Sequence, residues 1–213
     1  MPQHKKTVYH ADLVILAAGG LGTPVILEHS GIPCEKRLFV DPVLCVAGPL
    51  PGIHQEQQLL MPFISQQDGY ILSPYMDYLS FFFDKRWRYP MRDLVSIMIK
   101  LADDEKGSVT GRTVHKTMTE NDQARMQRAV AQSREILVRL GVAEDQQFLG
   151  ILNAGHPGGM LPLTAAEKET LHHAFLPENL YVADATLLPK AMGNPPILTI
   201  MALAKRIAHL ISA

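Results

Sequence analysis

Residues 179–204 read NLYVADATLLPKAMGNPPILTIMALA, and this stretch decides the expected fold. Residues 179–184 form a short apolar run, which is typical of a strand buried in a parallel sheet. A loop rich in proline and glycine follows, and the strongly apolar residues 197–211 predict a helix. A buried strand joined to a helix by such a loop indicates an α/β layer in which ligands bind beyond the carboxyl ends of the strands.

The beginning of the chain repeats this pattern. Residues 11–20, ADLVILAAGG, predict a strand buried on both faces of a parallel sheet. A helix should follow it, capped by Thr23, with Pro24 in its first position and its end before Gly31. Because both ends carry the same kind of unit, they are expected to form one doubly wound layer.

The residues between the two ends have a different pattern. Short alternating or apolar runs, such as 94–101 and 108–116, predict an antiparallel sheet. Residues 119–122, TEND, form a capping signature, and apolar residues at helical spacing run from there to Gly141. They predict a helix that covers one face of the sheet. The expected fold class is therefore α/β with an α+β insert: residues 1–37 and 151–213 make the partial doubly wound layer, and residues 38–150 make the antiparallel-sheet domain.

The composition limits the possible partners. The 213 residues carry a net charge of −1, which does not attract the chain to phosphate backbones, so no nucleic acid is expected. Cys34 and Cys45 are isolated and fit neither a disulfide framework nor a structural zinc site, and no metal site is predicted. The first 16 residues resemble neither a signal peptide nor a membrane span, so a cytoplasmic location is the default expectation.

His156 is the first candidate for chemistry. It lies in residues 154–160, AGHPGGM, where glycines let the backbone approach a ligand and leave the imidazole free of large neighbours. A histidine in this setting suits acid–base chemistry near neutral pH. The alternative interpretation is a structural histidine in a turn.

Asn194 is the second candidate. It lies in residues 193–196, GNPP, directly before the predicted terminal helix. One interpretation is simple capping, because asparagine is a preferred N-cap and proline is tolerated in the first helical turn. The other is that the helix N-terminus faces a bound group and stabilises its negative charge.

Several common motifs do not occur in the sequence. Gly19, Gly20 and Gly22 do not make a GxGxxG fingerprint, because Val25 stands at its last position. Neither a Walker lysine motif nor a GxSxG nucleophile elbow is present, which argues against phosphoryl transfer and hydrolysis.

Taken together, these segments resemble the glucose-methanol-choline flavoprotein oxidoreductases over nearly the whole chain and in the family's order. The matching segments are residues 11–31 (the strand and helix beside the adenosine half of the flavin), 98–116 (the substrate-domain sheet), 156–159 (His-x-x-Gly), and 179–186, 193–195 and 198–204 (the closing signature).

The resemblance implies that FAD is the cofactor and that a small-molecule alcohol is oxidised by hydride transfer to flavin N5. It implies that His156 is the base for the hydroxyl proton and that Asn194 hydrogen-bonds the substrate oxygen. The implied cofactor contacts are Ala17 and Gly19 at the adenosine portion, Asp184 and Ala185 at the diphosphate and ribityl chain, and Pro195 and Pro196 at the isoalloxazine. The terminal layer would then be the FAD-binding layer and residues 38–150 the substrate (cap) domain.

Two departures from the family pattern change the expectation. Met160 stands where the family usually has threonine, and the family's N-terminal third, with its glycine-rich turn and ribose-binding acid, is missing from this chain. A separate N-terminal FAD-binding chain or segment is therefore an expected partner, and such a segment could carry an export signal. The alternative is a non-catalytic subunit or truncated remnant that does not bind FAD alone.

Overall fold

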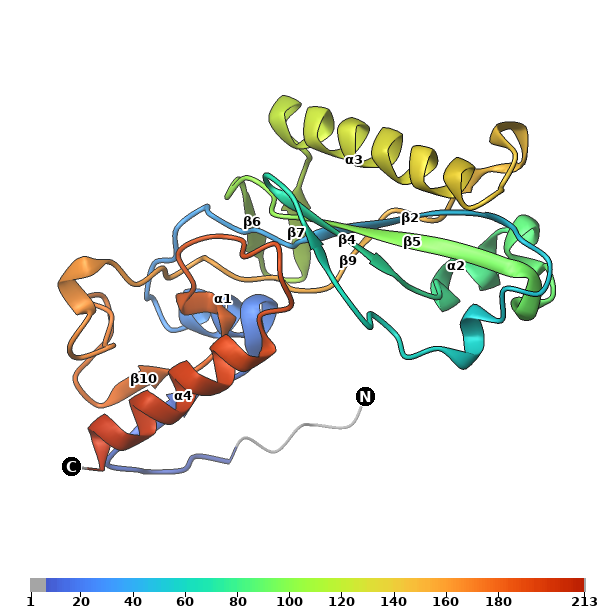
Figure 1. The fold of residues 1–213 in the computed structure, drawn as a ribbon. Coiled ribbons are helices and arrows are strands. Elements are labelled where there is room, and N and C mark those ends of the chain that lie inside the picture. Colours follow the sequence, from blue (N-terminus) through green and yellow to red (C-terminus); the bar gives the residue numbers. More distant parts are fainter. Residues whose placement is uncertain (1–6, 213) are drawn as a thin grey trace, which may run out of the picture.

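The computed structural model describes residues 7–212 and divides them into an antiparallel sheet with a long covering helix and a smaller layer made by the two chain ends (Figure 1). Its α-helices are α1 (Gly19–His29), α2 (Tyr78–Phe83), α3 (Glu120–Arg139) and α4 (Ile197–Ile211). Its strands are β1 (Val14–Leu16), β2 (Pro42–Pro49), β3 (Ser65–Gln66), β4 (Tyr70–Pro74), β5 (Leu94–Leu101), β6 (Gly107–Thr110), β7 (Thr113–Lys116), β8 (Phe148–Leu149), β9 (Asn153–Ala154) and β10 (Leu180–Val182).

The main sheet has the order β3-β4-β5-β2-β8, with β9 also paired to β2, and all its pairings are antiparallel. β5 is its centre: every residue of this strand is buried, and Cys45 of β2 lies opposite Met98 of β5. A strand buried on both faces reads as a continuous apolar run, which is why residues 94–101 were readable from the sequence. The predicted antiparallel sheet is confirmed.

Helix α3 covers one face of this sheet, as expected (Figure 1). Thr119 is its N-cap, and the side chains of Thr119 and Asp122 bond each other's backbone N–H groups in a capping box. Its buried face, which includes Met126 and Leu137, packs onto β2, β4 and β5. Leu140 departs from the expected apolar stripe because it lies half exposed at the C-cap.

The opposite face of the sheet has its own core. Trp87 and Phe148 meet edge to face with their ring centroids 5.6 Å apart, and Met98 packs beside them. The run at residues 108–116 forms a separate antiparallel hairpin, β6–β7, in which Gly111 adopts a positive φ of 56° and turns the chain.

The two ends of the chain form a parallel pair, β1 with β10, in the register Val14↔Leu180 to Leu16↔Val182. Helices α1 and α4 lie against this pair (Figure 1), around a core that includes Leu27, Val182 and Ile207. The expected joining of the two ends is confirmed. Among residues 7–212, this layer contains two strands.

Two expectations for this layer were wrong. The strand at the chain start is not buried on both faces: Val14 and Ile15 are 43% and 45% exposed, because β10 is their only described strand neighbour. Helix α1 begins at Gly19 rather than after Thr23, since the Thr23 hydroxyl bonds Asp184 Oδ2 instead of capping, and Pro24 lies inside the helix.

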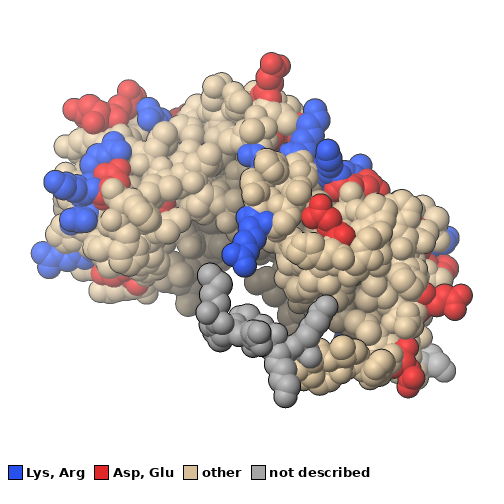
Figure 2. All heavy atoms as spheres, turned by 180° about the vertical axis from the view of Figure 1, so that it is seen from behind, with Lys and Arg blue, Asp and Glu red and all other residues tan. Residues whose placement is uncertain are grey.

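The boundaries at residues 37/38 and 150/151 stay predictions; β9, just beyond the second boundary, pairs with the main sheet. Residues 1–6 and 213 of the two end regions lie outside the described part of the chain. Charged side chains of both signs are interspersed over the face in Figure 2, with uncharged areas between them. No helix among residues 7–212 combines the length and the apolar character that a membrane span requires.

Candidate functional site

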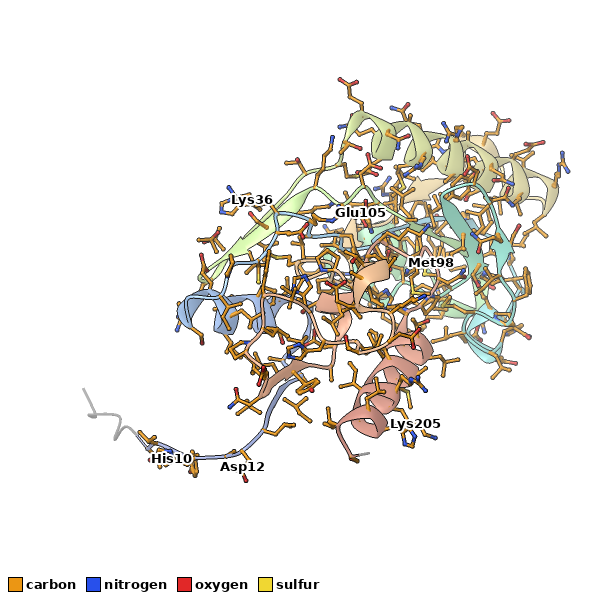
Figure 3. All side chains as sticks on the ribbon, turned by 90° about the vertical axis from the view of Figure 1, so that its left-hand side faces the viewer. His10, Asp12, Lys36, Met98, Glu105 and Lys205 are labelled. Carbon is orange, nitrogen blue, oxygen red and sulfur yellow. The ribbon has the colours of Figure 1, made fainter. Side chains whose placement is uncertain are left out.

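His156 lines a cavity of about 260 Å³ between the main sheet and the loop that precedes α4. Its other lining residues are mostly apolar or aromatic: Val43, Met61, Tyr75, Asp77, Tyr78, Leu79, Met98, Lys100, Asn153, Gly155 and Pro195. Figure 3 shows Met98 in the densely packed interior, while Lys205 of α4 points outward. The structure therefore brings His156 and Pro195, predicted separately from distant segments, to one cavity.

Backbone pairing holds the His156 loop against residues 39–41. Phe39 and Gly158 exchange hydrogen bonds of 3.1 Å in both directions, and the His156 N–H donates to the Val40 carbonyl at 3.2 Å. Gly159 has a φ of 87°, and a Cβ there would lie 2.7 Å from the Phe39 ring. The glycines after the histidine are therefore required by close packing as well as by backbone conformation.

Helix α1 fixes the loop from its other side. A Cβ on Gly20 would lie 1.9 Å from the carbonyl oxygen of Pro157, so the start of α1 rests directly on the residue after His156. The pattern of glycines near residue 20 thus serves helix-to-loop packing, which is one role of glycine in nucleotide-binding turns.

An ionic network lies behind the imidazole. His156 Nδ1 is buried, has no hydrogen-bond partner and lies 3.5 Å from Asp41 Oδ2. Asp41 is fully buried, has a φ of 51° and pairs with Lys100 Nζ at 2.5 Å. Burial lowers the pKa of Lys100, while the charge of Asp41 raises it in part. The histidine therefore faces a carboxylate whose charge is already compensated.

A second buried pair supports the first. Asp103 accepts hydrogen bonds from the backbone N–H groups of Val40 and Asp41 and pairs with Lys116 Nζ at 2.6 Å. Burial raises the pKa of Asp103, and the hydrogen bond from Lys116 opposes this rise. The turn that carries Asp41 is therefore fixed by Asp103, just after β5, and through it by Lys116 of β7.

The side chain of Asn194 does not cap α4. Its side-chain amide donates to Gln66 Oε1 at 2.9 Å, and its carbonyl accepts from Lys100 Nζ at 3.2 Å. The N-cap of α4 is Pro196, with no side-chain cap, so the capping interpretation of Asn194 is wrong. The pairing of Asn194 with His156 at a substrate oxygen stays a prediction.

Two of the residues predicted to contact the cofactor, Gly19 and Asp184, meet at the start of α1. Asp184 Oδ2 accepts from the Gly19 N–H at 2.9 Å and from the Thr23 hydroxyl at 2.5 Å, and its Oδ1 accepts from the Thr186 N–H at 2.8 Å. The Ala185 carbonyl accepts from the Gly159 N–H at 3.1 Å, which connects this cluster to the His156 loop.

The roles of the other predicted residues follow from their positions. Ala17 is exposed and lies one residue before Ala18, the N-cap of α1, and Pro196 is buried at the start of α4. Met160 packs with Leu38 and Val109 in a small core, so the departure from the family pattern at this position fills space. Contact of Ala17, Gly19, Asp184, Ala185, Pro195 and Pro196 with a cofactor stays a prediction.

The chain offers one feature that fits the negatively charged edge of a reduced flavin. Helix α4 has 15 residues and begins without a side-chain cap, directly after the cavity residue Pro195. Ile197 and Leu198 in its first turn are 59% and 79% exposed, and the first N–H groups of a helix have no partner within the helix and can bind an anion. The uncapped helix start therefore fits the group that the sequence implies.

Asp41 and Lys100 are the site residues that the sequence analysis missed. One signal for Lys100 was present: it is the only charged residue in the run LVSIMIKL, whose residues are otherwise apolar except for one serine. A lysine in a fully buried strand needs a partner and marks a candidate functional position. No local signal pointed to Asp41. Among residues 7–212, no three His, Cys, Asp or Glu side chains gather as a metal site.

Comparison with known proteins supports this reading of the fold. No protein-family model matches the chain. An uncharacterized protein of Methanocaldococcus jannaschii is 32% identical over 92% of this chain and 52% of its own length. A long-chain-alcohol oxidase of Arabidopsis thaliana is 24% identical over 98% of this chain and 36% of its own length. The chain thus spans about half the length, or less, of the curated relatives that it matches.

Two solved structures share the fold. Pyridoxine 4-oxidase from Mesorbium loti has a TM-score of 0.59 at 16% identity and covers 93% of this chain and 51% of its own. A formate oxidase of Aspergillus oryzae, studied for the effect of a mutation on FAD modification, has a TM-score of 0.65 at 12% identity and covers 94% and 54%. Both are glucose-methanol-choline oxidoreductases. The resemblance seen in the sequence is therefore confirmed at the level of the fold: over most of its length the chain shares the fold of about half of each of these glucose-methanol-choline oxidoreductases.

Proposed function

We propose that this chain is the catalytic part of a flavin-dependent enzyme that oxidises the CH–OH group of an alcohol. The observation that carries the proposal is His156: a histidine with a buried, unpartnered ring nitrogen, in a largely apolar cavity beside the uncapped start of α4. The comparisons add weight, because similar proteins are named as oxidases of long-chain alcohols, of pyridoxine and of formate.

In this proposal His156 accepts the proton of the substrate hydroxyl. The carbinol carbon gives up its hydrogen as a hydride, so that the alcohol becomes an aldehyde or ketone. FAD, when bound, supplies the hydride acceptor. A neutral imidazole suits the base role near pH 7, and a positioned base typically contributes about 10²-fold to 10⁴-fold in rate.

The residues that would hold FAD are the ones predicted from the resemblance. Ala17 and Gly19 would adjoin its adenosine portion, and Pro195 and Pro196 its isoalloxazine, whose negative charge the N-terminus of α4 would stabilise. Asp184 and Ala185 would adjoin the diphosphate and ribityl chain. Since the Asp184 carboxylate already binds two backbone N–H groups and a hydroxyl, it would act by fixing the start of α1.

The proposed partner is an N-terminal FAD-binding chain or segment. The exposed apolar side chains of the terminal layer support this part: Leu13, Val14 and Ile15 near β1, and Ile197, Leu198 and Met201 on α4. An open strand edge beside exposed apolar residues is a surface that proteins normally cover. Residues 38–150 would be the substrate domain, and the layer of residues 1–37 and 151–213 would bind FAD.

The first experiment is the visible absorption spectrum of the purified chain after incubation with FAD and removal of the excess. It is repeated with the N-terminal half of a full-length relative as the added partner. Flavin bands retained by the chain, alone or with the partner, support the proposal. A colourless protein under every condition supports the alternative, a non-catalytic subunit or remnant.

The second experiment tests the base. In the flavin-loaded protein, His156→Ala should lower alcohol turnover at least about 10²-fold while the flavin stays bound. The exposed His115, on β7 and outside the cavity, gives the matched control, and His115→Ala should leave turnover unchanged. Equal turnover in wild type and His156→Ala would remove His156 from the role of base.

A further inference from the structure

We propose that Asp41 and Lys100 are positioning residues for His156: Asp41 fixes the imidazole tautomer with the proton on Nδ1, and Lys100 balances the charge of Asp41. This inference deepens the proposed function and rests on it for the catalytic meaning of His156. The Asp41–Lys100 pair itself can be tested without flavin or substrate.

The position of the imidazole supports a proton on Nδ1, directed toward Asp41. His156 Nδ1 and Asp41 Oδ1 are both buried and both lack a hydrogen-bond partner, and Nδ1 lies 3.5 Å from the neighbouring oxygen, Oδ2. An unpartnered ring nitrogen thus lies beside a carboxylate that still has one unused acceptor oxygen, and hydrogen bonds of catalytic groups are often long before substrate binds. With Nδ1 protonated toward Asp41, Nε2 is the nitrogen left to accept a proton in the cavity.

The backbone around Asp41 holds its carboxylate in place beside the His156 loop. Asp41 has a φ of 51°, which is unusual for a residue other than glycine, and it is held there by Asp103, which accepts from its N–H at 2.8 Å. Backbone strain of this kind concentrates at functional sites. The same turn pairs with the His156 loop, since Val40 accepts from the His156 N–H. The carboxylate and the imidazole are therefore held on two segments bonded to each other.

Lys100 compensates the negative charge of Asp41. A lone buried carboxylate would stabilise the imidazolium and leave His156 protonated, hence unable to accept a proton. The ammonium of Lys100, with its side chain only 2% exposed, cancels this effect by pairing with Asp41 Oδ2. Lys100 Nζ also donates to the carbonyls of Gly193 and Asn194, at 3.1 and 3.2 Å. One side chain thus links the His156 support to the loop before α4.

The other charged groups near this site are paired with other partners. Asp77 lines the same cavity, but its carboxylate accepts from the N–H and the hydroxyl of Ser80. Asp103 and Lys116 pair with each other one layer behind. The charges of Asp41 and Lys100 are therefore expected to have the largest electrostatic effect on His156.

The test is an NMR titration of His156 in the full chain, using ring ¹⁵N shifts to read both its pKa and its tautomer. In wild type the Nδ1–H tautomer should dominate. Lys100→Met should raise the pKa of His156 by about 1 unit or more, because Asp41 is then uncompensated. Asp41→Asn should weaken the tautomer preference. Lys106→Met, at an exposed lysine outside the cavity, should leave both readouts unchanged.

Because removing one partner of a buried ion pair can unfold a protein, the double variant Lys100→Met with Asp41→Asn is measured as well. It removes both charges, so its His156 pKa should return to within about half a unit of wild type. A His156 titration that is identical in wild type, Asp41→Asn and the double variant, with an Nε2–H tautomer in wild type, would overturn the proposal.

The same variants separate this inference from the proposed function. If the NMR effects appear but no flavin-loaded form oxidises alcohols, the proposed function fails and the positioning role stands. If alcohols are oxidised, Lys100→Met should shift the acidic limb of the kcat/KM profile to higher pH. An unshifted limb in Lys100→Met would count against the positioning role alone.

Discussion

Gly20→Ala tests whether α1 supports the His156 loop. In an isolated helix this change would be stabilising by about 1 kcal/mol. Here the new Cβ would lie 1.9 Å from the Pro157 carbonyl oxygen and 2.8 Å from the Gly158 nitrogen, and backbone atoms cannot move aside as a flexible side chain can. Overpacking costs typically 1–3 kcal/mol, and this contact is among the severe ones, so a net loss of about 2 kcal/mol is expected.

Thermal unfolding followed by circular dichroism measures this loss. For a chain of 213 residues, a loss of about 2 kcal/mol lowers Tm by roughly 4–8 °C. Gly155→Ala is the matched control, because a Cβ there meets no atom within 4 Å and its φ is not positive. Its Tm should stay level or rise slightly. If Gly20→Ala melts at or above the wild-type temperature, the packing of α1 on the loop is not as described.

Three further outcomes are expected. Thr119→Ala removes the capping box of α3 and should lower the free energy of unfolding by about 1 kcal/mol, measured by urea denaturation. Asp184→Ala leaves two backbone N–H groups and the Thr23 hydroxyl without their acceptor, so a larger loss of about 2–4 kcal/mol is expected in the same assay. Burial and, secondarily, the charge of Glu28 raise the pKa of the Cys34 thiol to about 11, so Cys34 should react slowly with a disulfide reagent at pH 8, and faster in Glu28→Gln.

The elements that were predictable are those determined by local signals. Residues 94–101 are apolar except for Ser96 and Lys100, as suits a fully buried strand, and they match β5 at both ends. Helix α3 has its own capping box, and residues 197–211 match α4 because a largely apolar helical segment follows two prolines. In each case the residues that define the element lie within it or next to it.

Tertiary contacts decided the elements that were predicted wrongly. Thr23 has the composition of an N-cap, but its hydroxyl bonds Asp184, 161 positions away, and the helix extends past it to Gly19. The exposure of β1 depends on how many strands flank it, and this number cannot be deduced from a single apolar run. Neither the hydrogen bond of Thr23 nor the missing neighbour of β1 is encoded in the adjacent sequence.

The candidate site divides in the same way. His156 was found because its glycine neighbours mark a close backbone approach, which is a local property. Asp41 was missed because its importance comes from a positive φ and from partners 59 and 62 positions along the chain, Lys100 and Asp103. Only the single lysine in an apolar strand was readable, and its partner was not.

The pairing of β1 with β10 also determines the order in which the molecule is assembled. Gly19 and Asp184, at the junction of the two ends, lie 165 positions apart, and bringing such distant segments together costs on the order of 4–5 kcal/mol of chain entropy. Three residue pairs do little to offset that cost, whereas β2 and β5 share seven. We therefore expect the antiparallel sheet with α3 to form early and to exchange its amide hydrogens slowly. The terminal layer should then close last and open first, so a ligand or protein that binds across it would hold the two ends of the chain together.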